Sequence, residues 1–527
     1  MKRVIKNFIV IKLKNGWRHY EYLNKLMRII MKKYILSIDQ GTTSSRVILF
    51  DKENNIVASS QLEVGVICEH SGWVEQNALE IWETVYECLK MVISKPNINP
   101  LDIASIGITN QRETTIIWDK ITGKPLCNAI VWQSRQSTEI CEKWIDKGYT
   151  DIIKDKTGLI INPYFSASKI KFMIENNPII LEKINKGEAL FGTVDSYLVW
   201  KLTEGKVHIT DTSNASRTML FNINTLKWDE KLLEMFDIPK GILPTVVSSS
   251  EIYGEATILK KINNNLSIPI SSVIGDQQAS LFGQCCFNAG DVKNTYGTGC
   301  FMLMNTKENI VSSNNGLLTT IAWTIDGKTE YALEGSVFVA GSAVQWLRDG
   351  MRLISKSKEV EESSRDQGSN GVYVVPAFVG LGTPYWDNDA RGSVFGLTRA
   401  TTRENFINAT VESIAYQSKD VMEVMKEDSK LEINSLAVDG GASSNNYLMK
   451  FQSNILNCKI VRPYCLETTA LGAAYLAGLA VGFWDNKDDL IRLHKVEQIF
   501  MPDMSDEERN KLYNGWKKAV EATMIFK

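Results

Sequence analysis

The chain has 527 residues and a formal net charge of −2. Because one hydrophobic core stops growing beyond ~250 to 300 residues, this length predicts two domains with a cleft between them. Hydrophobic residues make up 44% and charged residues 23% of the chain, as in soluble globular proteins. A charge so close to zero argues against nucleic acid as a partner, so we expect any phosphate binding to be local. No apolar run reaches the ~18 residues that a membrane span needs, and we expect none.

The first thirty residues differ from the rest of the chain. They carry eight Lys and Arg against a single Glu, and they precede a second plausible start at Met31. A secretory signal needs an uninterrupted apolar core of ~7 to 15 residues, but the stretch FIVI is followed by Lys12 and Lys14. We interpret residues 1–30 as an extension with no catalytic role; a targeting or membrane-surface segment is the alternative.

Cysteine and histidine residues give no sign of a disulfide framework or a metal site. None of the nine cysteines forms a C-x-x-C pair, and the four histidines lie far apart, at positions 19, 70, 208 and 494. We therefore expect reduced cysteines in a cytoplasmic protein, and no Ser-His-Asp catalytic triad.

The first predicted strands surround a loop of small polar residues. Apolar stretches at 34–39, 46–51 and 56–64 predict three strands. Between the first two lies the sequence Gly-Thr-Thr-Ser-Ser, at 41–45, which presents backbone N–H groups and hydroxyls. An ordinary hairpin turn does not need so many hydrogen-bond donors. A concentration of donors is typical of an anion-binding loop.

A helix and two more strands follow. Asn77 can cap a helix with Glu80 three residues later, and one helix face is predicted to contain Leu79, Trp82, Tyr86, Leu89 and Ile93. Strands at 104–110 and 114–119 flank the sequence Gln-Arg-Glu at 111–113. These elements predict a mixed sheet that opens with antiparallel hairpins and is covered by helices.

The same order of features returns in the second half of the chain. An extended stretch, a loop of Gly297, Thr298 and Gly299, and an apolar strand follow one another in DVKNTYGTGCFMLMNT. Further on, SLAVDGGASSNNYLMKFQSNIL predicts a strand, a Gly-Gly turn and a helix capped near Ser443 or Ser444. The two glycines permit close approach of a flat ligand, although an ordinary tight turn also fits. We infer two similar halves that face each other across a cleft.

Ten motifs in one order resemble a known family. They are IDQGTTSSR, ITNQRET, AIVWQSR, PYFSASKIKF, ASRTMLFNI, GDQQASLFGQ, YGTGCF, YALEGSVFVAGSAVQWLRD, GLGTPYWDNDARG and DGGASSNN. Together they resemble the FGGY family of carbohydrate kinases, which share the actin and Hsp70-type ATPase fold, and within it the members that phosphorylate glycerol. The resemblance runs from about Lys33 to Ala522, with Phe172 standing where the family usually has Trp.

This resemblance implies an α/β fold of two actin/Hsp70-like (ribonuclease H-like) domains, each a mixed sheet with helices, facing across a nucleotide cleft. It implies a glycerol and phosphate site in the N-terminal domain, residues 31–283, and a nucleotide site in the C-terminal domain, residues 284–527. The implied activity is ATP-dependent phosphorylation of glycerol to sn-glycerol 3-phosphate, the first step of glycerol catabolism, in a homodimer or homotetramer.

For the first polar loop, the resemblance implies contact of Thr42, Thr43 and Ser44 with the β- and γ-phosphates of ATP. Arg46 starts the return strand, where its guanidinium can pair with the transferring phosphoryl group, because charge and positioning stabilise such transition states. Asp39 ends the first strand and is assigned to Mg²⁺, directly or through water. Capping of a turn is the alternative role for Asp39.

In the second half, the resemblance implies that Thr298 belongs to a second phosphate loop. It implies further contacts around the adenosine and phosphates from Gly341, Gln345, Gly441 and Asn445. Gly341 and Gln345 lie one helical turn apart and therefore on one face. Taken alone, Gln345 would be interpreted as a surface helix residue.

On the substrate side, Arg112 and Glu113 can donate to and accept from neighbouring hydroxyls through charge-assisted hydrogen bonds. An internal salt bridge is the alternative. The resemblance implies that Trp132, Tyr164 and Phe301 form a wall along the carbon backbone of glycerol. Without it, each single aromatic residue would be assigned to the core.

Asp276, at the end of the apolar run in SSVIGDQQAS, is the expected general base. A positioned carboxylate there can accept the proton of the attacking hydroxyl. Its neighbour Gln277 is expected to hold another hydroxyl of the substrate.

Two other functions remain open. A kinase of another polyol or ketose, such as xylulose or gluconate, would be favoured by a roomier site without the Arg-Glu pair and the aromatic wall. A non-phosphorylating nucleotide clamp of the actin or Hsp70 kind would act through partners. The presence of Asp276 and of a substrate-side constellation argues against the clamp.

Regulation by a sugar bisphosphate is expected to be absent. Some bacterial members of the family bind fructose 1,6-bisphosphate through a Gly-Gly-Thr-Arg loop that precedes the GDQQ motif. The corresponding stretch here, between Ile262 and Gly275, reads INNNLSIPISSVIG, which has no Arg, no Lys and no glycine pair. Since charge-assisted bonds to phosphate are roughly twice as strong as neutral ones, we expect no inhibition by this ligand.

Overall fold

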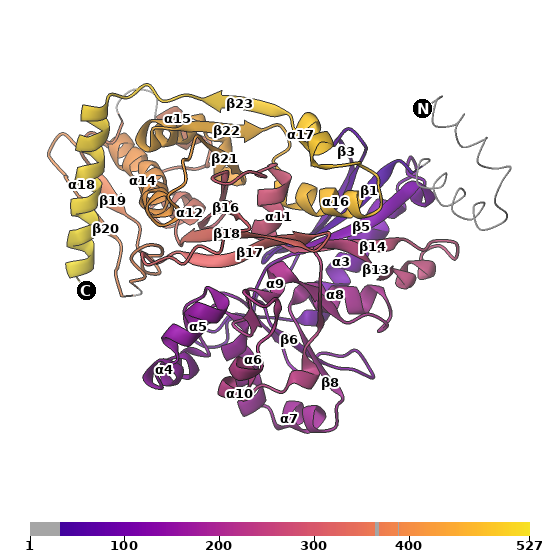
Figure 1. The fold of residues 1–527 in the computed structure, drawn as a ribbon. Coiled ribbons are helices and arrows are strands. Elements are labelled where there is room, and N and C mark those ends of the chain that lie inside the picture. The colour runs from indigo at the N-terminus through magenta and orange to yellow at the C-terminus, as the bar shows by residue number, and fades with distance from the viewer. Residues whose placement is uncertain (1–31, 364–367, 388, 527) are drawn as a thin grey trace.

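The computed structural model describes residues 32–363, 368–387 and 389–526, so the expected extension at 1–30 lies outside the described residues. One sheet of 13 strands runs through the molecule, with most helices of the second half above it and a smaller helical subdomain below it (Figure 1). Its strand order is β23-β22-β21-β15-β16-β18-β17-β13-β14-β5-β1-β2-β3.

The sheet contains the same five-stranded pattern twice. The N-terminal copy has the order β3-β2-β1-β5-β14 and the C-terminal copy β18-β16-β15-β21-β22. In each copy the first three strands form an antiparallel meander and the last two pair in parallel. This repeat confirms the predicted α/β fold. The strands are β1 (Tyr34–Gln40), β2 (Ser44–Phe50), β3 (Ile56–Glu63), β5 (Ile103–Asn110), β14 (Pro269–Gly275), β15 (Val292–Tyr296), β16 (Cys300–Lys307), β18 (Lys328–Val337), β21 (Ser435–Asp439) and β22 (Lys459–Pro463).

Additional strands join the two copies edge to edge. β13 and β17 pair in parallel at Ser250 and Ile325, and each also pairs antiparallel with a strand of its own copy. β23 closes the far edge beside β22. The remaining strands are β4 (Glu75–Gln76), β6 (Ile116–Asp119), β7 (Ala129–Ile130), β8 (Ala189–Gly192), β9 (Ile209–Asp211), β10 (Phe221–Asn222), β11 (Lys227–Trp228), β12 (Thr245–Val247), β13 (Ser250–Glu255), β17 (Leu318–Ile325), β19 (Tyr373–Val375), β20 (Ser393–Phe395) and β23 (Val496–Phe500).

Helices cover both faces of the sheet and build the subdomain below it (Figure 1). They are α3 (Ala78–Ile93), α4 (Thr138–Asp146), α5 (Thr150–Thr157), α6 (Ser166–Asn176), α7 (Pro178–Asn185), α8 (Val194–Leu202), α9 (Thr212–Ala215), α10 (Glu230–Phe236), α11 (Asp276–Gly283), α12 (Gly341–Asp349), α13 (Glu359–Ser363), α14 (Arg403–Ser429), α15 (Asn446–Leu456), α16 (Thr468–Ala480), α17 (Lys487–Leu493) and α18 (Asp506–Ile525).

Helix α3 begins where the sequence predicts. The Asn77 side chain accepts the backbone N–H of Leu79 at 3.0 Å and so caps the helix. Trp82 and Leu89 face the core as predicted, but Leu79 is 36% exposed. Its inward place in the first turn is taken by Ile81, which is fully buried.

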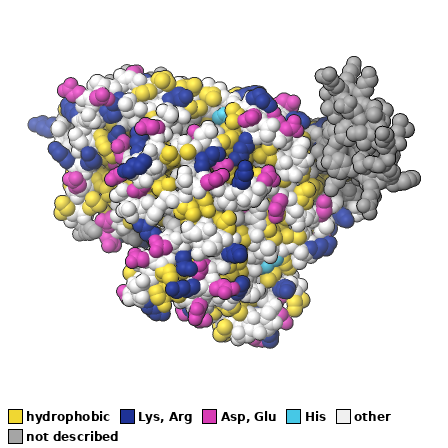
Figure 2. Space-filling model, in the orientation of Figure 1, with side chains coloured by type: hydrophobic (Ala, Val, Ile, Leu, Met, Phe, Trp, Pro, Cys, Tyr) yellow, Lys and Arg dark blue, Asp and Glu magenta, His cyan; other side chains and the backbone are white. Residues whose placement is uncertain are grey.

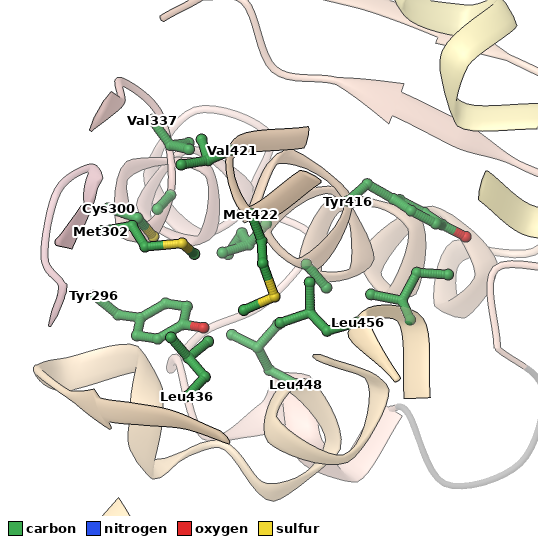
Figure 3. Packing of buried hydrophobic residues seen from close by; sticks show 14 of the residues in the cluster. Tyr296, Cys300, Met302, Val337, Tyr416, Val421, Met422, Leu436, Leu448 and Leu456 are labelled. Carbon is green, nitrogen blue, oxygen red and sulfur yellow. The ribbon is translucent and has the colours of Figure 1, made fainter. Parts of the chain in front are cut away.

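The core of the C-terminal half lies between the sheet and helices α14 and α15. Tyr296 and Met302 of the sheet meet Met422 of α14 and Leu448 of α15 (Figure 3). Each such fully buried side chain contributes about 1.5 to 3 kcal/mol through loss of contact with water. The Tyr296 hydroxyl donates to Gln452 Oε1 at 2.9 Å, so this buried polar group is hydrogen-bonded within the core.

Helices α11 and α16 cross at the junction of the two halves in direct backbone contact. A Cβ on Gly283 would lie 2.0 Å from the Thr468 carbonyl oxygen, and one on Gly472 would lie 1.8 Å from that of Ala279. On its other side α16 meets β5, where a Cβ on Gly107 would lie 2.3 Å from the helix backbone. Only glycine permits such approach. A helix from late in the chain therefore packs directly on the N-terminal sheet.

The first polar loop is shorter than predicted. β2 begins at Ser44, so only Gly41, Thr42 and Thr43 lie between the strands. The Gly41 N–H donates to the Ser44 carbonyl at 2.9 Å, and ladder pairing of Gln40 with Ser45 continues the hairpin to this turn. Because of this backbone pairing, Ser44 and Ser45 belong to strand β2 and not to the loop.

The predicted cap of the helix after the Gly-Gly turn is wrong. Asn445 caps α15, with its Oδ1 accepting the N–H of Leu448 at 2.9 Å. Ser443 and Ser444 lie instead in a short 3₁₀ helix, η4 (Gly441–Ser444), where their hydroxyls donate to carbonyl oxygens three residues back. This 3₁₀ turn moves the start of the α-helix along the chain.

On the face shown in Figure 2, Lys and Arg side chains of the described residues lie among Asp and Glu without a broad field of one sign. None of the described helices is both long enough and apolar enough to cross a membrane. All nine cysteines are free of disulfide bonds.

Candidate active site

Arg112 lies two residues after the end of β5, at the junction of the two halves. Its guanidinium forms a bidentate pair with Glu334 of β18, from Nη1 to Oε2 at 2.6 Å and from Nη2 to Oε1 at 2.8 Å. Burial alone would raise the pKa of Glu334, but Arg112 and Arg217 hold it at about 2. Arg112, which was predicted to lie on the substrate side, is thus fixed by a carboxylate from the opposite half of the molecule.

Glu113 faces Arg217 rather than Arg112. Arg217 Nε donates to Glu113 Oε1 at 2.6 Å, whereas Arg112 Nε is 3.9 Å from the same oxygen. Arg217 Nη2 also donates to Glu334 at 3.1 Å, which closes a buried network of four charged side chains. Glu113 has a φ of 59°, a left-handed conformation that costs about 1 to 3 kcal/mol and is concentrated at functional sites.

Asp276 is the first residue of α11, immediately after β14. Its Oδ1 accepts the N–H of Gln277 at 2.7 Å and lies 3.3 Å from Arg112 Nε. No side chain or backbone group of the described residues donates to Oδ2, and the side chain is 27% exposed. Burial raises the pKa of Asp276, while Arg112 and Lys293 partly oppose this shift. The carboxylate is held at one oxygen and has the other available for proton transfer.

The three predicted aromatic residues lie together beside the charged network. The ring of Trp132 is 5.6 Å from that of Tyr164 and 6.0 Å from that of Phe301, both at edge-to-face angles. The Tyr164 hydroxyl accepts from Arg112 Nη2 at 3.3 Å. Trp132 Nε1 donates to Thr42 Oγ1 at 2.9 Å, so the aromatic wall is joined to the first polar loop.

Buried amides fix the backbone of the first polar loop. Gln76 Nε2 donates to the Thr42 carbonyl at 2.7 Å, and Gln111 Nε2 donates to Gln76 Oε1 at 2.8 Å. With the Thr42 carbonyl engaged, the exposed Thr43 forms the tip of the loop and Ser44 begins β2. Gln111 precedes Arg112 in the chain, so one short segment supports both the loop and the charged network.

Asp39 and Arg46 lie opposite each other on β1 and β2. Arg46 forms an ion pair with Glu467 and donates to Gln61 at 2.8 Å. Burial raises the pKa of Asp39 to about 7; Arg46 opposes this, and Glu467 and Asp276 add to it. No hydrogen bond reaches the Asp39 carboxylate from the described residues. No group of three or more His, Cys, Asp or Glu within them is arranged as a complete metal site.

Three glycine-containing segments meet at the turn between β15 and β16. The Gly341 N–H donates to the Gly297 carbonyl at 3.0 Å, and a Cβ on Gly341 would lie 2.4 Å from that oxygen. Thr298, at the tip of the turn, accepts the backbone N–H of Ala340 at 2.9 Å. Nothing lies within 4 Å of a Cβ built on Gly441, which leaves open space on that side.

Two residues that were predicted to bind the nucleotide, Gln345 and Asn445, form no hydrogen bond to the turn between β15 and β16 within the described residues. Gln345 is exposed on α12, one turn from Gly341. Asn445 uses its side-chain oxygen to cap α15. The structure therefore brings Thr298 and Gly341 together through the backbone, and the neighbouring Gly440 approaches the same hairpin, since a Cβ on it would lie 2.4 Å from the Tyr296 carbonyl oxygen. Within the described residues, no hydrogen bond joins the side chains of Gln345 and Asn445 to Thr298, Gly341 or Gly441.

Glu334, Arg217 and Lys293 were not among the predicted site residues. Each is fully buried, and each lies within or beside a motif that the sequence singled out. A charged residue inside an apolar stretch, such as Glu334 in YALEGSVFV, is the sequence signal that could have identified such a residue. Its partner could not be found from sequence, because Arg112 lies more than two hundred residues away.

Comparison with known proteins assigns the family. Residues 34–283 match the N-terminal domain of the FGGY family of carbohydrate kinases, and residues 292–481 match its C-terminal domain. The chain belongs to the FGGY family. The resemblance inferred from the ten motifs is thereby confirmed. The exact division of the chain after residue 283 stays a prediction.

FGGY relatives match along nearly the whole chain. A glycerol kinase from Bacillus mycoides (strain KBAB4) is 58% identical over 498 residues, which cover 94% of this chain and 100% of the relative. The solved structure of Plasmodium falciparum glycerol kinase with ADP is 42% identical, with a TM-score of 0.86 and coverage of 93% and 98% of the two chains. A xylulose kinase from Lactobacillus acidophilus, 22% identical with a TM-score of 0.83 and coverage of 93% and 97%, shares the fold.

Proposed function

We propose that this FGGY protein is a glycerol kinase. It transfers the γ-phosphoryl group of ATP to a terminal hydroxyl of glycerol and gives sn-glycerol 3-phosphate, the first step of glycerol catabolism. The observation that carries the proposal is the aromatic wall of Trp132, Tyr164 and Phe301 set against the charged network beside Asp276. Relatives 58% identical over their full length carry the same name, which supports it.

In the proposed reaction Asp276 is the general base. Its Oδ2 receives the proton of the attacking hydroxyl, while Oδ1 stays bound to the Gln277 N–H and Arg112. Burial keeps the pKa of Asp276 above its ordinary value, which favours proton acceptance. Arg112 and Glu113 hold the other hydroxyls of glycerol, and the aromatic wall excludes water from its carbon chain.

The phosphates are bound from both halves. Thr42, Thr43 and Ser44 present donors from one side, and the turn at Thr298 presents them from the other. Arg46 lies next to the first loop with a charge suited to the transferring phosphoryl group. The adenosine is bound near Gly341 and Gly441, with Gln345 and Asn445 at the periphery.

Asp39 fits a magnesium ion. Its carboxylate receives no hydrogen bond from the described residues, and its acidic neighbours Glu467 and Asp276 disfavour its ionised form until a cation compensates. Mg²⁺ prefers one or two carboxylates together with phosphate oxygens and water, and it would supply charge neutralisation at the β- and γ-phosphates.

Measurement of ADP release tests the proposal. ATP turnover is followed with glycerol, with D-xylulose, with D-gluconate and with no second substrate. We expect fast release only with glycerol. Faster turnover with a ketose or sugar acid would indicate a kinase for that substrate, and slow release independent of any second substrate would indicate a nucleotide clamp.

Two further properties are proposed, the cellular location and the oligomeric state. Nine cysteines free of disulfide bonds are consistent with a cytoplasmic enzyme. Family resemblance favours a homodimer or homotetramer, and light scattering on the purified chain distinguishes these from a monomer.

A further inference from the structure

Lys293 is a buried cation outside the predicted site residues. It lies on β15, its side chain is fully buried, and it forms no ion pair within the described residues. Burial lowers the pKa of its ammonium to about 8. The carboxylates of Asp439 and Asp276 partly oppose this lowering of the pKa without forming an ion pair with Lys293. Because a buried ammonium needs hydrogen-bond acceptors, its hydrogen bonds indicate what it does there.

The three protons of the Lys293 ammonium go to three different acceptors. They are Gln277 Oε1 at 2.5 Å, Thr295 Oγ1 at 2.8 Å and the Phe301 carbonyl at 3.1 Å. Gln277 lies in the first turn of α11, Thr295 on β15 and Phe301 on β16. One side chain thus ties the helix that carries Asp276 to the hairpin that carries the aromatic residue Phe301.

This contact decides which way the Gln277 amide faces. An ammonium can only donate, so the amide must turn its oxygen toward Lys293. The amide nitrogen, Nε2, then faces away from Lys293, and it donates to no group of the described residues. The backbone N–H of Gln277 is bound to Asp276 Oδ1 at 2.7 Å, which keeps Gln277 beside the proposed base.

We propose that Lys293 is a positioning residue for the polyol: it holds the Gln277 amide so that Nε2 donates a hydrogen bond to a hydroxyl oxygen of the substrate. The inference rests on the proposed function, because it assigns Gln277 to the glycerol site. The hydroxyl bound by Gln277 accepts this bond and keeps its own proton free for another acceptor. Without Lys293 the amide can rotate and present its oxygen instead.

Lys293→Met in the full chain tests the proposal. Met removes all three donors and retains a long unbranched side chain, and the melting temperature of the variant is measured beside its kinetics because three acceptors lose their donor. We expect the KM for glycerol to rise about tenfold or more, as for loss of an oriented hydrogen bond, with the KM for ATP within about twofold of wild type. Lys419→Met, another largely buried lysine on α14, controls for loss of a lysine as such.

A double-mutant cycle separates positioning from a general structural effect. If Lys293 acts through Gln277, Lys293→Met adds little to the glycerol KM once Gln277→Ala is present. The proposal would be overturned if the double variant raised the glycerol KM by the product of the two single-variant fold-changes. It would also be overturned if Lys293→Met alone kept the glycerol KM within twofold of wild type.

Gln277→Glu tests the amide orientation without altering Lys293. The carboxylate still accepts from the ammonium but has no N–H for the substrate, so we expect the glycerol KM to rise while the melting temperature is kept. Wild-type affinity in this variant would show that Nε2 does not bind the substrate. Turnover of the wild-type protein with glycerol separately tests the proposed function. If another polyol is the substrate, the KM of Gln277→Glu and of the wild-type protein is compared for that polyol.

Discussion

At the scale of single residues, proton transfer by Asp276 is the step most open to test. Asp276→Asn keeps the shape of the side chain but cannot accept a proton. We expect the variant to fold and bind ATP, with kcat lowered by about 10²- to 10⁴-fold. Steady-state turnover and calorimetric ATP titration provide the two measurements.

The exposed Asp237→Asn serves as the matched control, since among the residues that the structure describes Asp237 pairs only with Lys171 on the surface. A rate above about a tenth of wild type in Asp276→Asn would remove this residue from the role of base.

Glu334 gives a second prediction at this scale, because two guanidinium groups depend on it. Glu334→Gln leaves Arg217 with Glu113 and Arg112 with the partly exposed Asp276, and breaking a buried ion pair from one side destabilises by about 3 to 5 kcal/mol. We expect a lower melting temperature and a higher KM for glycerol, since Arg112 loses its bidentate partner.

Glu230→Gln is the control for Glu334→Gln, because the one ion pair of Glu230 in the described part of the chain is an exposed pair with Lys240, worth about 0 to 1 kcal/mol. Equal melting temperatures for the two variants would contradict the structural role given to Glu334.

At the scale of elements, the start of helix α12 has no room for a side chain. Gly341→Ala places a Cβ 2.4 Å from the Gly297 carbonyl oxygen, so the helix must move away from the turn at Thr298. We expect the KM for ATP to rise several-fold, with a smaller change in the KM for glycerol. Gly241→Ala, where nothing lies within 4 Å, is the matched control. An unchanged ATP affinity in Gly341→Ala would place the nucleotide elsewhere.

Local elements were predictable from sequence and their assembly was not. The two hairpins, β1 with β2 and β15 with β16, follow from alternating apolar residues around small polar loops, and α3 follows from the Asn77 cap. The joining of β13 to β17 at Ser250 and Ile325, and the packing of α16 on Gly107, depend on residues far apart in the chain. No local pattern encodes such contacts.

The candidate site divides in the same way. Asp276, the proposed base, and the two proposed phosphate loops could be located on the fold because a strand end or a glycine-rich turn marks them. The partners of Arg112 and Gln277 could not be placed, because Glu334 and Lys293 come from the other half of the chain.

At the scale of the whole molecule, the absence of sugar bisphosphate inhibition is the testable property. The region before β14 contains the 3₁₀ helix η3 (Thr257–Lys261). Lys261 lies 3.5 Å from Glu204, and Ser267 donates to Glu255 at 2.9 Å. Glu255 adds a negative charge beside Ser267, which disfavours binding of a phosphate there. We expect initial rates to be unaffected by fructose 1,6-bisphosphate at low salt.

Half-inhibition at or below about a millimolar would contradict this expectation. Reversal of such inhibition by Lys260→Ala together with Lys261→Ala would then identify these lysines as the binding groups.

Because α16 covers the sheet built from the first part of the chain, that part of the sheet can be covered only after α16 has been synthesised. Ile35 and Ile48 of that sheet share a buried cluster with Ala473 and Leu476 of α16. A nascent chain that has emerged only as far as α11 lacks this cover and leaves those isoleucines in water. The first half therefore completes its core only after most of the second half has left the ribosome, and pulse proteolysis of stalled chains of increasing length follows this step. We therefore expect the first half to gain its full resistance to proteolysis only late in translation.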